Sequence, residues 1–316
     1  VVEQPVINEE AGTIVFAVNE EVESLKFTPI IEISEGATIT PASGVAQDFS
    51  NNKKVTYTVT AEDGTVKVYT AFVEGTRKVL KYSFEDWKEG SKNDELLPKD
   101  LWAGSAAGAG ILGGTLLRKE TREDGTYAAK LITFEYPNEP NSLVPKITAG
   151  SIFIGKFDMM PALQGDRLSC TKFGLDAETV SLGGKPLCFK GVYKYESGSN
   201  YLDASNYEDV KPVDIKDKGQ IQAVLYKVQT GEDGKEIVLT GHDVNTSELR
   251  VAVANIIVED IKEYTPFNIE FEYLQEYDRN AKYKFAIVCS SSKDGDLFKG
   301  AGGSTLIVDE FEVICE

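Results

Sequence analysis

The chain has 316 residues, long enough for two domains or for one large β domain with an appendage. It carries 33 Lys and Arg against 51 Asp and Glu, which gives a formal net charge of −18. A chain of this charge repels a phosphate backbone, so we expect no nucleic acid as a partner. No apolar run approaches the ~20 residues that a spanning helix needs, so we expect no direct membrane span.

The first predicted unit covers residues 1–76. It contains the β-rich runs VTYTVT and TVKVYTAFV, which flank the turn sequence EDGT at residues 62–65. A boundary is expected near EGTRK, residues 74–78, where a β unit of immunoglobulin-like length ends and a new strand begins. We therefore predict an immunoglobulin-like β-sandwich over residues 1–76 and a larger unit over residues 77–316.

The larger unit is also predicted to be β throughout. In FNIEFEYL, residues 267–274, apolar and polar side chains alternate with the period of a half-buried strand. Other β-rich runs are YAAKLITFEY, SIFIGKF, CFKGVYKY, QIQAVLYKV, LRVAVANIIV, YKFAIV and TLIVDEFEVI. The best helical candidate is the short region 87–102. Many strands and few helices predict an all-β chain built as sandwiches or barrels.

Residues 108–113, GAGILG, match the glycine spacing of dinucleotide-binding loops. Such a match carries weight only between a strand and a helix, where the glycines let a pyrophosphate approach the helix N-terminus. Neither flank supplies that context. We predict instead that residues 103–114 form a glycine-rich loop, just after Trp102 and close to a ligand pocket.

The cysteines and the single histidine give no metal or nucleophile signature. His242 lies in a polar turn sequence, and no C-x-x-C spacing is present, so neither a zinc site nor a histidine-based nucleophilic centre is expected. We expect small buried thiols, and a disulfide is left open if the chain is exported. The cysteines concerned are Cys170, Cys188, Cys289 and Cys315.

Both predicted units resemble known modules. Residues 39–73 resemble the small immunoglobulin-like module that precedes glycan-related domains in exported lipoproteins of glycan-foraging gut bacteria. The larger unit resembles the family called "putative carbohydrate metabolism domain" (PCMD). That resemblance rests on YSFEDW, AGSIFIGKF, KGVYKYESG and, above all, SSSKDGDLFKGAGGSTLIVDEFEV at residues 290–313.

The resemblance implies a jelly-roll β-sandwich, similar to carbohydrate-binding domains, with a ligand pocket on the sandwich. It also implies an exported protein at the cell surface or in the periplasm. In that setting the chain would be tethered to the outer membrane by a lipid on a cysteine upstream of residue 1. The expected partner is an oligo- or polysaccharide.

One carboxylate stands among apolar positions of a predicted core strand. Asp309 shares a strand face with Ile307, Phe311 and Val313, and a buried carboxylate needs a partner. In carbohydrate-binding jelly rolls, acidic residues on the first and last strands meet at a structural calcium ion, and the resemblance implies this role for Glu85 and Asp309. The alternative is a carboxylate satisfied by hydrogen bonds alone.

Sugar sites combine aromatic faces with directional hydrogen bonds, which directs attention to the clustered aromatic residues. Tyr193, Tyr195 and Tyr201 lie close together in the sequence, and Trp102 flanks the glycine-rich segment. We expect all four to be ligand-binding candidates, with Trp102 and Tyr201 the better ones. Tyr193 and Tyr195 alternate as strand residues and can equally be packing residues.

A second predicted loop, residues 290–304, mixes charged, apolar and glycine residues. Its Asp294, Asp296 and Phe298 are expected at the rim of the pocket, and the alternative is a solvated turn. The leading functional hypothesis is a non-catalytic carbohydrate-binding protein. The first alternative is a glycoside hydrolase that uses Asp294, Asp296 or Glu196, and the second is a structural or protein-docking module of a surface assembly.

Overall fold

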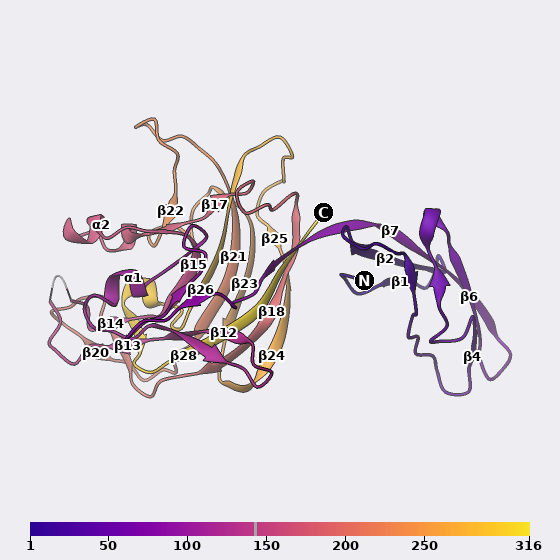
Figure 1. Ribbon diagram of the computed structural model, residues 1–316, viewed down its shortest axis with the longest axis horizontal. Coiled ribbons are helices and arrows are strands. Elements are labelled where there is room, and N and C mark those ends of the chain that lie inside the picture. The colour runs from indigo at the N-terminus through magenta and orange to yellow at the C-terminus, as the bar shows by residue number, and fades with distance from the viewer. Residues whose placement is uncertain (142–143) are drawn as a thin grey trace. The chain divides into compact units, whose positions relative to one another are not determined.

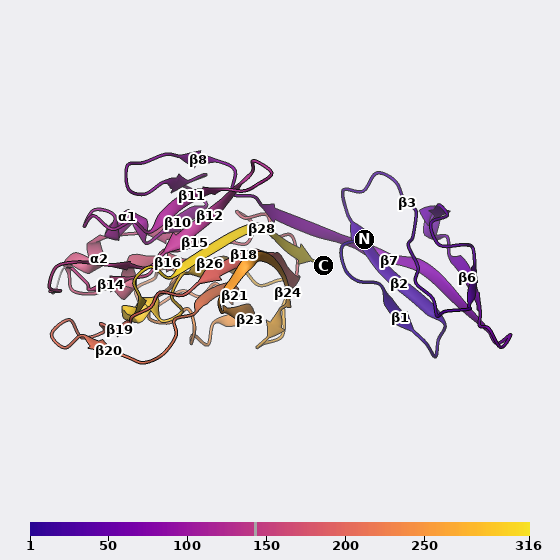
Figure 2. The same cartoon turned by 90° about the horizontal axis from the view of Figure 1, so that it is seen from below.

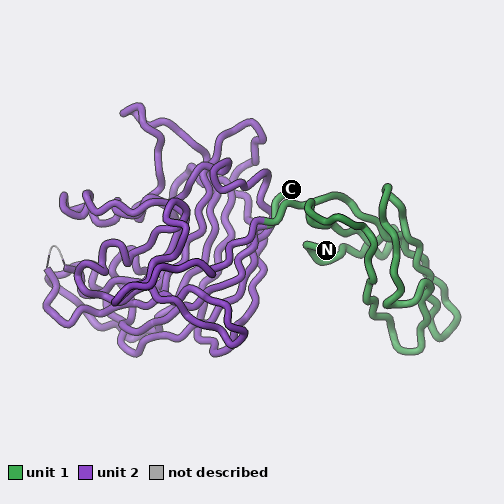
Figure 3. Tube along the Cα trace, in the orientation of Figure 1, with its two compact units in different colours: residues 1–79, 314–316 green, residues 80–313 purple. Residues whose placement is uncertain are grey.

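A computed structural model describes residues 1–141 and 144–316 of the chain (Figure 1). These residues form two compact units, coloured separately in Figure 3. Unit 1 comprises Val1–Val79 together with Ile314–Glu316, and unit 2 comprises Leu80–Val313. The sequence-based boundary was placed after residue 76, whereas the structural division follows Val79.

Unit 1 is a small assembly of β-strands. Strand β2 (Thr13–Asn19) pairs antiparallel with β1 (Val6–Asn8) and parallel with β7 (Val66–Tyr82). Its other elements are β3 (Lys26–Phe27), β4 (Thr38–Thr40), β5 (Gln47–Asp48), β6 (Val55–Thr60) and a 3-10 turn at Ser50–Asn52. Strand β6 pairs with both β4 and β7, and β3 pairs with β5. The strand β7 is continuous and carries the chain from unit 1 into unit 2.

Aromatic side chains fill the core of unit 1. Phe16 and Phe49 meet edge to face with ring centroids 5.1 Å apart, and Tyr57 is buried in the same cluster. The alternation in VTYTVT places Tyr57 on the inner face, as the period of a strand requires. The hairpin turn between β6 and β7 is closed by Gly64 at φ 86°. The immunoglobulin-like assignment of this unit remains a prediction.

Unit 2 contains two main sheets (Figures 1 and 2). In the first sheet β28 pairs with β12 and β18, β12 pairs with β11, and β18 pairs with β24. These strands are β11 (Leu117–Thr121), β12 (Tyr127–Ile132), β18 (Pro186–Glu196), β24 (Ile261–Glu270) and β28 (Thr305–Cys315).

The second sheet has the strand order β22-β16-β15-β26-β21-β23-β25, with β10 beside β15 and β17 beside β26. Its central strands β15, β21 and β26 pair antiparallel with one another. The strands are β10 (Trp102–Gly104), β15 (Ser151–Phe157), β16 (Thr171–Phe173), β17 (Leu175–Asp176), β21 (Gly219–Lys227), β22 (Leu239–Thr240), β23 (Arg250–Val258), β25 (Glu272–Tyr273) and β26 (Tyr283–Ser290).

Short elements complete unit 2. Two-stranded pairs are formed by β8 (Trp87–Lys88) with β9 (Glu95–Leu96) and by β13 (Phe134–Glu135) with β14 (Ile147–Thr148). Strand β19 (Tyr201–Asp203) lies between β20 (Lys211–Pro212) and β27 (Lys299–Ala301). The helices α1 (Ala106–Ala109) and α2 (Met160–Leu163) each have a single turn, and 3-10 turns occur at Leu168–Cys170 and Gly295–Leu297.

Aromatic side chains of the first sheet and of Phe84 form a cluster in the core of unit 2. Phe311 of β28 contacts Phe84, Phe189 and Phe267 edge to face, with centroids 5.0–5.8 Å apart. Gly191 makes room for this cluster, because a Cβ atom there would lie 2.5 Å from the Phe311 ring. The sequence-based prediction of an all-β chain is confirmed, and the four cysteines are buried as expected. In the part of the chain that the structure describes, no helix has the length and apolarity to cross a membrane.

Candidate functional site

The second sheet of unit 2 has two different faces. Ile154 lies opposite Trp102 in the ladder, and Trp102 packs against Tyr82 and Phe84, so this face looks toward the first sheet. Because side chains alternate along a strand, Ser151, Phe153 and their partners point the other way. A pocket of about 210 Å³ opens on this outward face.

Carboxamide side chains form the polar part of the pocket floor. Gln222 is only 5% exposed, and its Nε2 donates a hydrogen bond to Asn245 Oδ1 at 3.2 Å. Gln220 stands two residues earlier on the same face of β21, and its Nε2 donates to Asn255 Oδ1 at 2.9 Å. In the described chain, Gln222 Oε1 has no donor, so it is available to accept a hydrogen bond from a ligand.

Apolar side chains form the rest of the floor and much of the wall. Phe173, Val244 and Val288 belong to one buried cluster and all line the pocket. Phe157 lines it from the end of β15, and its ring packs on Gly108 of α1 so closely that a Cβ atom there would be 2.5 Å from it. Phe298 contributes another aromatic ring to the lining. The pocket thus joins ring faces to a few fixed polar groups, a usual arrangement for small-ligand sites.

Charged groups enter the pocket from its walls. Arg167 lies 5.2 Å from the centre of the Phe298 ring, and burial holds the pKa of its guanidinium below the ordinary value. Asp296 lines the pocket as well, and burial raises the pKa of its carboxyl, with a smaller contribution from the charge of Asp294. Among the described residues that line the pocket, Asp296 is the only carboxylate.

The glycine-rich segment forms part of the pocket wall, through Ser105, Gly108, Ala109 and Leu112. It differs from the predicted loop in holding the one-turn helix α1, which begins at Ala106. Small side chains let this turn approach β15, where Ser151 N donates to Ser105 Oγ at 3.0 Å. The segment has no long helix for a pyrophosphate to approach, so the structure gives no support to a dinucleotide site.

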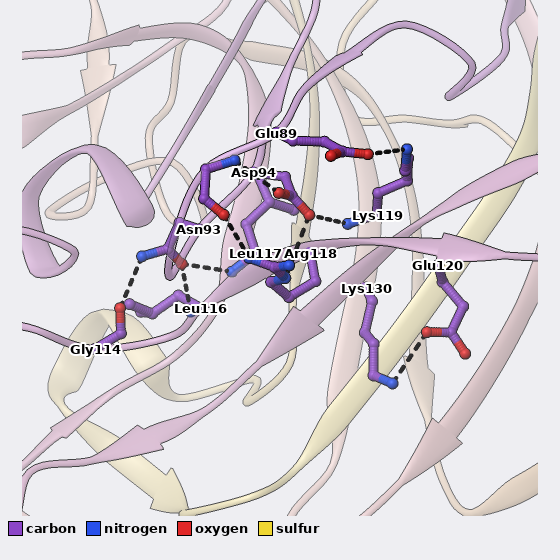
Figure 4. A network of polar contacts seen from close by, with 11 residues as sticks. Glu89, Asn93, Asp94, Gly114, Leu116, Leu117, Arg118, Lys119, Glu120 and Lys130 are labelled. Atoms are coloured by element: carbon purple, nitrogen blue, oxygen red, sulfur yellow. Dashed lines mark hydrogen bonds and ion pairs between the residues drawn. The ribbon is translucent and has the colours of Figure 1, made fainter.

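A polar network fixes the chain directly after this segment (Figure 4). Asn93 Nδ2 donates to Gly114 O at 2.7 Å, and Asn93 Oδ1 accepts from the backbone of Leu116 and Leu117. The buried carboxylate of Asp94 accepts from Lys119 N at 2.8 Å and pairs with Arg118 at 3.3 Å. These contacts connect the end of the glycine-rich segment and the start of β11 to Asn93 and Asp94.

Several predicted ligand residues lie at or close to the pocket. Asp296 and Phe298 line it. Asp294 does not, but the Tyr201 hydroxyl donates to its Oδ2 at 3.0 Å, and Lys293 pairs with it at 2.6 Å. Tyr201 and Asp294 are not part of the lining, but they adjoin the wall that carries Asp296 and Phe298, and their role in ligand binding stays a prediction.

Other predicted ligand residues are packing residues. Trp102 is 6% exposed and lies between the sheets beside Tyr82 and Phe84, because the alternation of β10 turns its side chain inward. Tyr195 is also buried, and its hydroxyl donates to Ser291 O at 3.0 Å. Tyr193 packs on Phe267 in the first sheet. None of these three residues is part of the pocket lining, and a ligand-binding role for them stays a prediction.

Glu85 and Asp309 have protein partners in the structure. Asp309 forms an ion pair with Arg122, which also pairs with Glu310, and Glu85 accepts a hydrogen bond from Tyr127 N at 3.2 Å. No group of three or more His, Cys, Asp or Glu side chains that could hold a metal is found among the described residues. Arg122 therefore supplies the positive charge that the sequence-based hypothesis assigned to calcium, and the calcium site stays a prediction.

Replacing Arg122 with methionine tests this account of Asp309. We expect the free energy of unfolding to fall by about 1–3 kcal/mol, because a nearly buried carboxylate loses its cation. We also expect EDTA to leave the melting temperature of the unmodified protein unchanged. A melting temperature that falls in EDTA and recovers with Ca²⁺ would instead establish the calcium site.

Sequence reasoning missed the carboxamides of the floor. A usable signal was present in QIQAVLYKV, where Gln220 and Gln222 stand two residues apart at the start of a strand that continues with the apolar run AVLY. Two polar residues on one face of such a strand indicate a polar patch on that face. Arg167 and Phe157 lacked any comparable signal, because their neighbours in the pocket are distant in sequence.

The family model described as "Putative carbohydrate metabolism domain" matches residues 54–314, and the model described as "SGBP, N-terminal" matches residues 2–73. Among curated proteins, no match is found.

Two of the solved structures that resemble the chain are named as putative glycoside hydrolases. The first, from Bacteroides thetaiotaomicron, is 31% identical with a TM-score of 0.64 and covers 99% of this chain and 92% of its own. The second, from Bacteroides vulgatus, is 28% identical with a TM-score of 0.61 and covers 75% of this chain and 98% of its own. By the extent of the family match, the chain belongs to the PCMD family.

Proposed function

We propose that unit 2 binds a carbohydrate in the pocket on the outward face of its second sheet. The observation that carries the proposal is the pairing of carboxamides with aromatic rings around one cavity, Gln220 and Gln222 on the floor with Phe157 and Phe298 on the walls. Sugars present hydroxyl groups at their edges and C–H surfaces on their faces. A site for them therefore combines planar hydrogen-bonding groups with apolar faces.

The carboxylate content of the pocket favours binding over hydrolysis. Glycoside hydrolysis ordinarily needs two carboxyl groups that flank the scissile bond. Asp296 is the only described carboxylate in the lining, and Asp294 pairs with Lys293 and accepts a hydrogen bond from the Tyr201 hydroxyl. The residue Glu196, a further candidate from the sequence, is exposed and is not part of the lining.

A glycoside hydrolase is the second candidate function. Two observations favour it: the names of the two similar structures and the raised pKa of the Asp296 carboxyl. A raised pKa shifts a carboxyl toward the protonated form that a general acid needs at a glycosidic oxygen. In this reading the second carboxylate would have to come from a residue that moves toward the pocket when a glycan binds.

The family matches support a role outside the cytoplasm. We propose that the protein works at the cell surface or in the periplasm, held by a lipid anchor, with unit 1 as an immunoglobulin-like spacer. The match of residues 2–73 to "SGBP, N-terminal" supports this setting. A structural module that docks a protein partner, and not a glycan, is the remaining alternative.

A glycan array combined with a polysaccharide release assay distinguishes these functions. We expect binding to one or a few glycans without release of reducing ends, because the cavity offers hydrogen bonds and ring faces but one carboxylate. Release of reducing ends that is lost in Asp296→Asn would establish the hydrolase. If no glycan bound and no reducing ends were released, the carbohydrate-binding proposal would be overturned and protein docking would be favoured.

Replacing Gln222 with leucine tests the floor of the pocket. We expect the affinity for the glycan found on the array to fall about ten- to hundredfold, because a buried carboxamide that bonds the ligand is lost at nearly constant volume. The measurement is isothermal titration calorimetry, and the melting temperature reports whether folding is intact. The matched control is Gln229→Leu, an exposed position after β21 that is not part of the lining. Unchanged affinity in Gln222→Leu would place the site elsewhere.

A further inference from the structure

Polar and apolar side chains stand next to each other on the floor of the pocket. Gln222 and Val288 are direct neighbours in the ladder between β21 and β26, so a carboxamide and an isopropyl group stand side by side on the floor. Beyond Val288 the lining continues with Phe173 and Val244, which are 7% and 3% exposed. A ligand that bonds Gln222 therefore has an apolar surface directly beside the bonded group.

A sugar ring bears hydroxyl groups around its whole edge, and not all of them find partners in such a pocket. A hydroxyl placed against Val288, Phe173 or Val244 loses its water without gaining a protein hydrogen bond, which is unfavourable. A methyl group in the same place gains from leaving water. The floor therefore discriminates between these two substituents at one position of the ring.

The walls and the entrance extend the apolar surface. Leu168 and Ala162 line the pocket from the segment between β15 and β16, and Leu112 lines it from the end of the glycine-rich wall. Leu112 is 40% exposed, and Met159 also belongs to the lining. Apolar side chains thus reach from the buried floor to the solvent-exposed edge.

The size of the pocket limits how much of a glycan it holds. Its volume of about 210 Å³ lies below the roughly 300–1,000 Å³ that is typical of sites for drug-sized ligands. A site of this size encloses about one sugar unit, and the rest of the glycan would extend past the entrance. Selectivity therefore depends on the substituents of the enclosed unit.

We propose that the pocket selects a sugar unit that carries a methyl group, either as a 6-deoxy sugar or within an acetyl substituent. This inference rests on the proposed carbohydrate-binding function of the same pocket. The enclosed unit bonds Gln222 through a polar group and places its methyl group against Val288, Phe173 and Val244.

The test compares sugars that differ at one substituent, by titration calorimetry and ligand-observed NMR on the full chain. The pairs are L-fucose with L-galactose, L-rhamnose with L-mannose, and methyl N-acetyl-β-D-glucosaminide with methyl β-D-glucoside. We expect the methyl-bearing member of one pair to bind about tenfold more tightly, and the pair that responds distinguishes the 6-deoxy source from the acetyl source.

Two valine substitutions connect this preference to the floor. In Val288→Thr and in Val244→Thr a hydroxyl replaces a methyl group that faces the ligand, so the ratio of affinities within the responding pair should fall at least threefold. Val192→Thr on β18 of the first sheet is the matched control and should leave the ratio unchanged. Two valine variants are used so that a folding defect in one does not decide the result.

The outcomes separate the inference from the function on which it rests. Equal binding within every pair, or tighter binding of the hydroxylated members, would overturn the methyl preference and leave the carbohydrate site standing. The methyl preference would also be overturned if none of the sugars in the pairs bound. If no glycan on the array bound either, the proposed carbohydrate-binding function would be overturned as well.

Discussion

Replacing Trp102 with alanine is expected to lower the free energy of unfolding by about 3–5 kcal/mol, the cost of removing a large buried aromatic side chain. Trp102 is 6% exposed, and its ring centroid lies 5.4 Å from that of Phe84 and 5.9 Å from that of Tyr82. The cavity left behind would lie between the two sheets of unit 2, where neighbouring strands cannot move inward freely. Urea unfolding followed by tyrosine and tryptophan fluorescence measures the loss.

The second tryptophan provides the control. Trp87 is half-buried on the two-residue strand β8, and its indole N–H donates to Phe84 O at 2.6 Å. We expect Trp87→Ala to cost clearly less stability than Trp102→Ala, because less apolar surface is lost from the core. A glycan affinity that falls in Trp102→Ala without any loss of stability would contradict the packing role and return Trp102 to the ligand site.

The second large loss of stability is expected on replacing a buried carboxylate, Asp217. Asp217 is 2% exposed and accepts hydrogen bonds from Ser292 Oγ at 2.6 Å, Ala301 N at 2.8 Å and Ser304 Oγ at 2.7 Å. These donors lie at the two ends of the loop that carries Asp296 and Phe298, so Asp217 closes that loop. Asp217→Ala should cost about 2–4 kcal/mol of unfolding free energy, since three buried donors lose their acceptor.

The pH dependence of stability distinguishes the effect of ionising Asp217 from the effect of the size and shape of its side chain. Burial raises the pKa of Asp217 in the folded protein, so the folded state holds this proton to higher pH than the unfolded state does. Its contribution to stability is therefore greatest below about pH 4, near the unfolded pKa, and is lost as the pH rises through the folded pKa.

Asp217→Asn isolates this contribution, because its side chain is nearly isosteric and does not titrate. As the pH rises from 4 to 7, the unfolding free energy of the original protein should fall relative to that of Asp217→Asn. Urea unfolding at a series of pH values measures it. A difference that is constant over this range would show that Asp217 has the same pKa in both states.

Much of the fold follows from local patterns in the sequence. Alternation in FNIEFEYL and VTYTVT predicts strands that the structure contains, and the EDGT turns mark hairpins such as the one between β6 and β7. Alternation along a strand shows that the strand has two different faces, but it does not show which face lies inside the sandwich. That uncertainty is why Trp102 and Tyr195 were assigned to a ligand surface although they pack between the sheets.

The pocket was predictable only in part, for a related reason. The loop 290–304 could be predicted because charged, apolar and glycine residues are mixed in one continuous segment. Two of its residues, Asp296 and Phe298, do line the cavity. Gln222 and Val288, in contrast, become neighbours only through a pairing between strands about sixty residues apart in sequence, which no local pattern specifies. Contacts of this kind have to be read from the sheet register.

The contact between Gly108 and Phe157 has a consequence for how such a pocket can change. A side chain at residue 108 would need the space that the Phe157 ring now occupies, so either the ring or the α1 turn would have to shift. Both line the cavity, and its width therefore depends on a residue that offers no hydrogen bond to a ligand. Exchanging Gly108 for a larger residue would therefore change the width of the pocket, while the carboxamide floor would stay as it is.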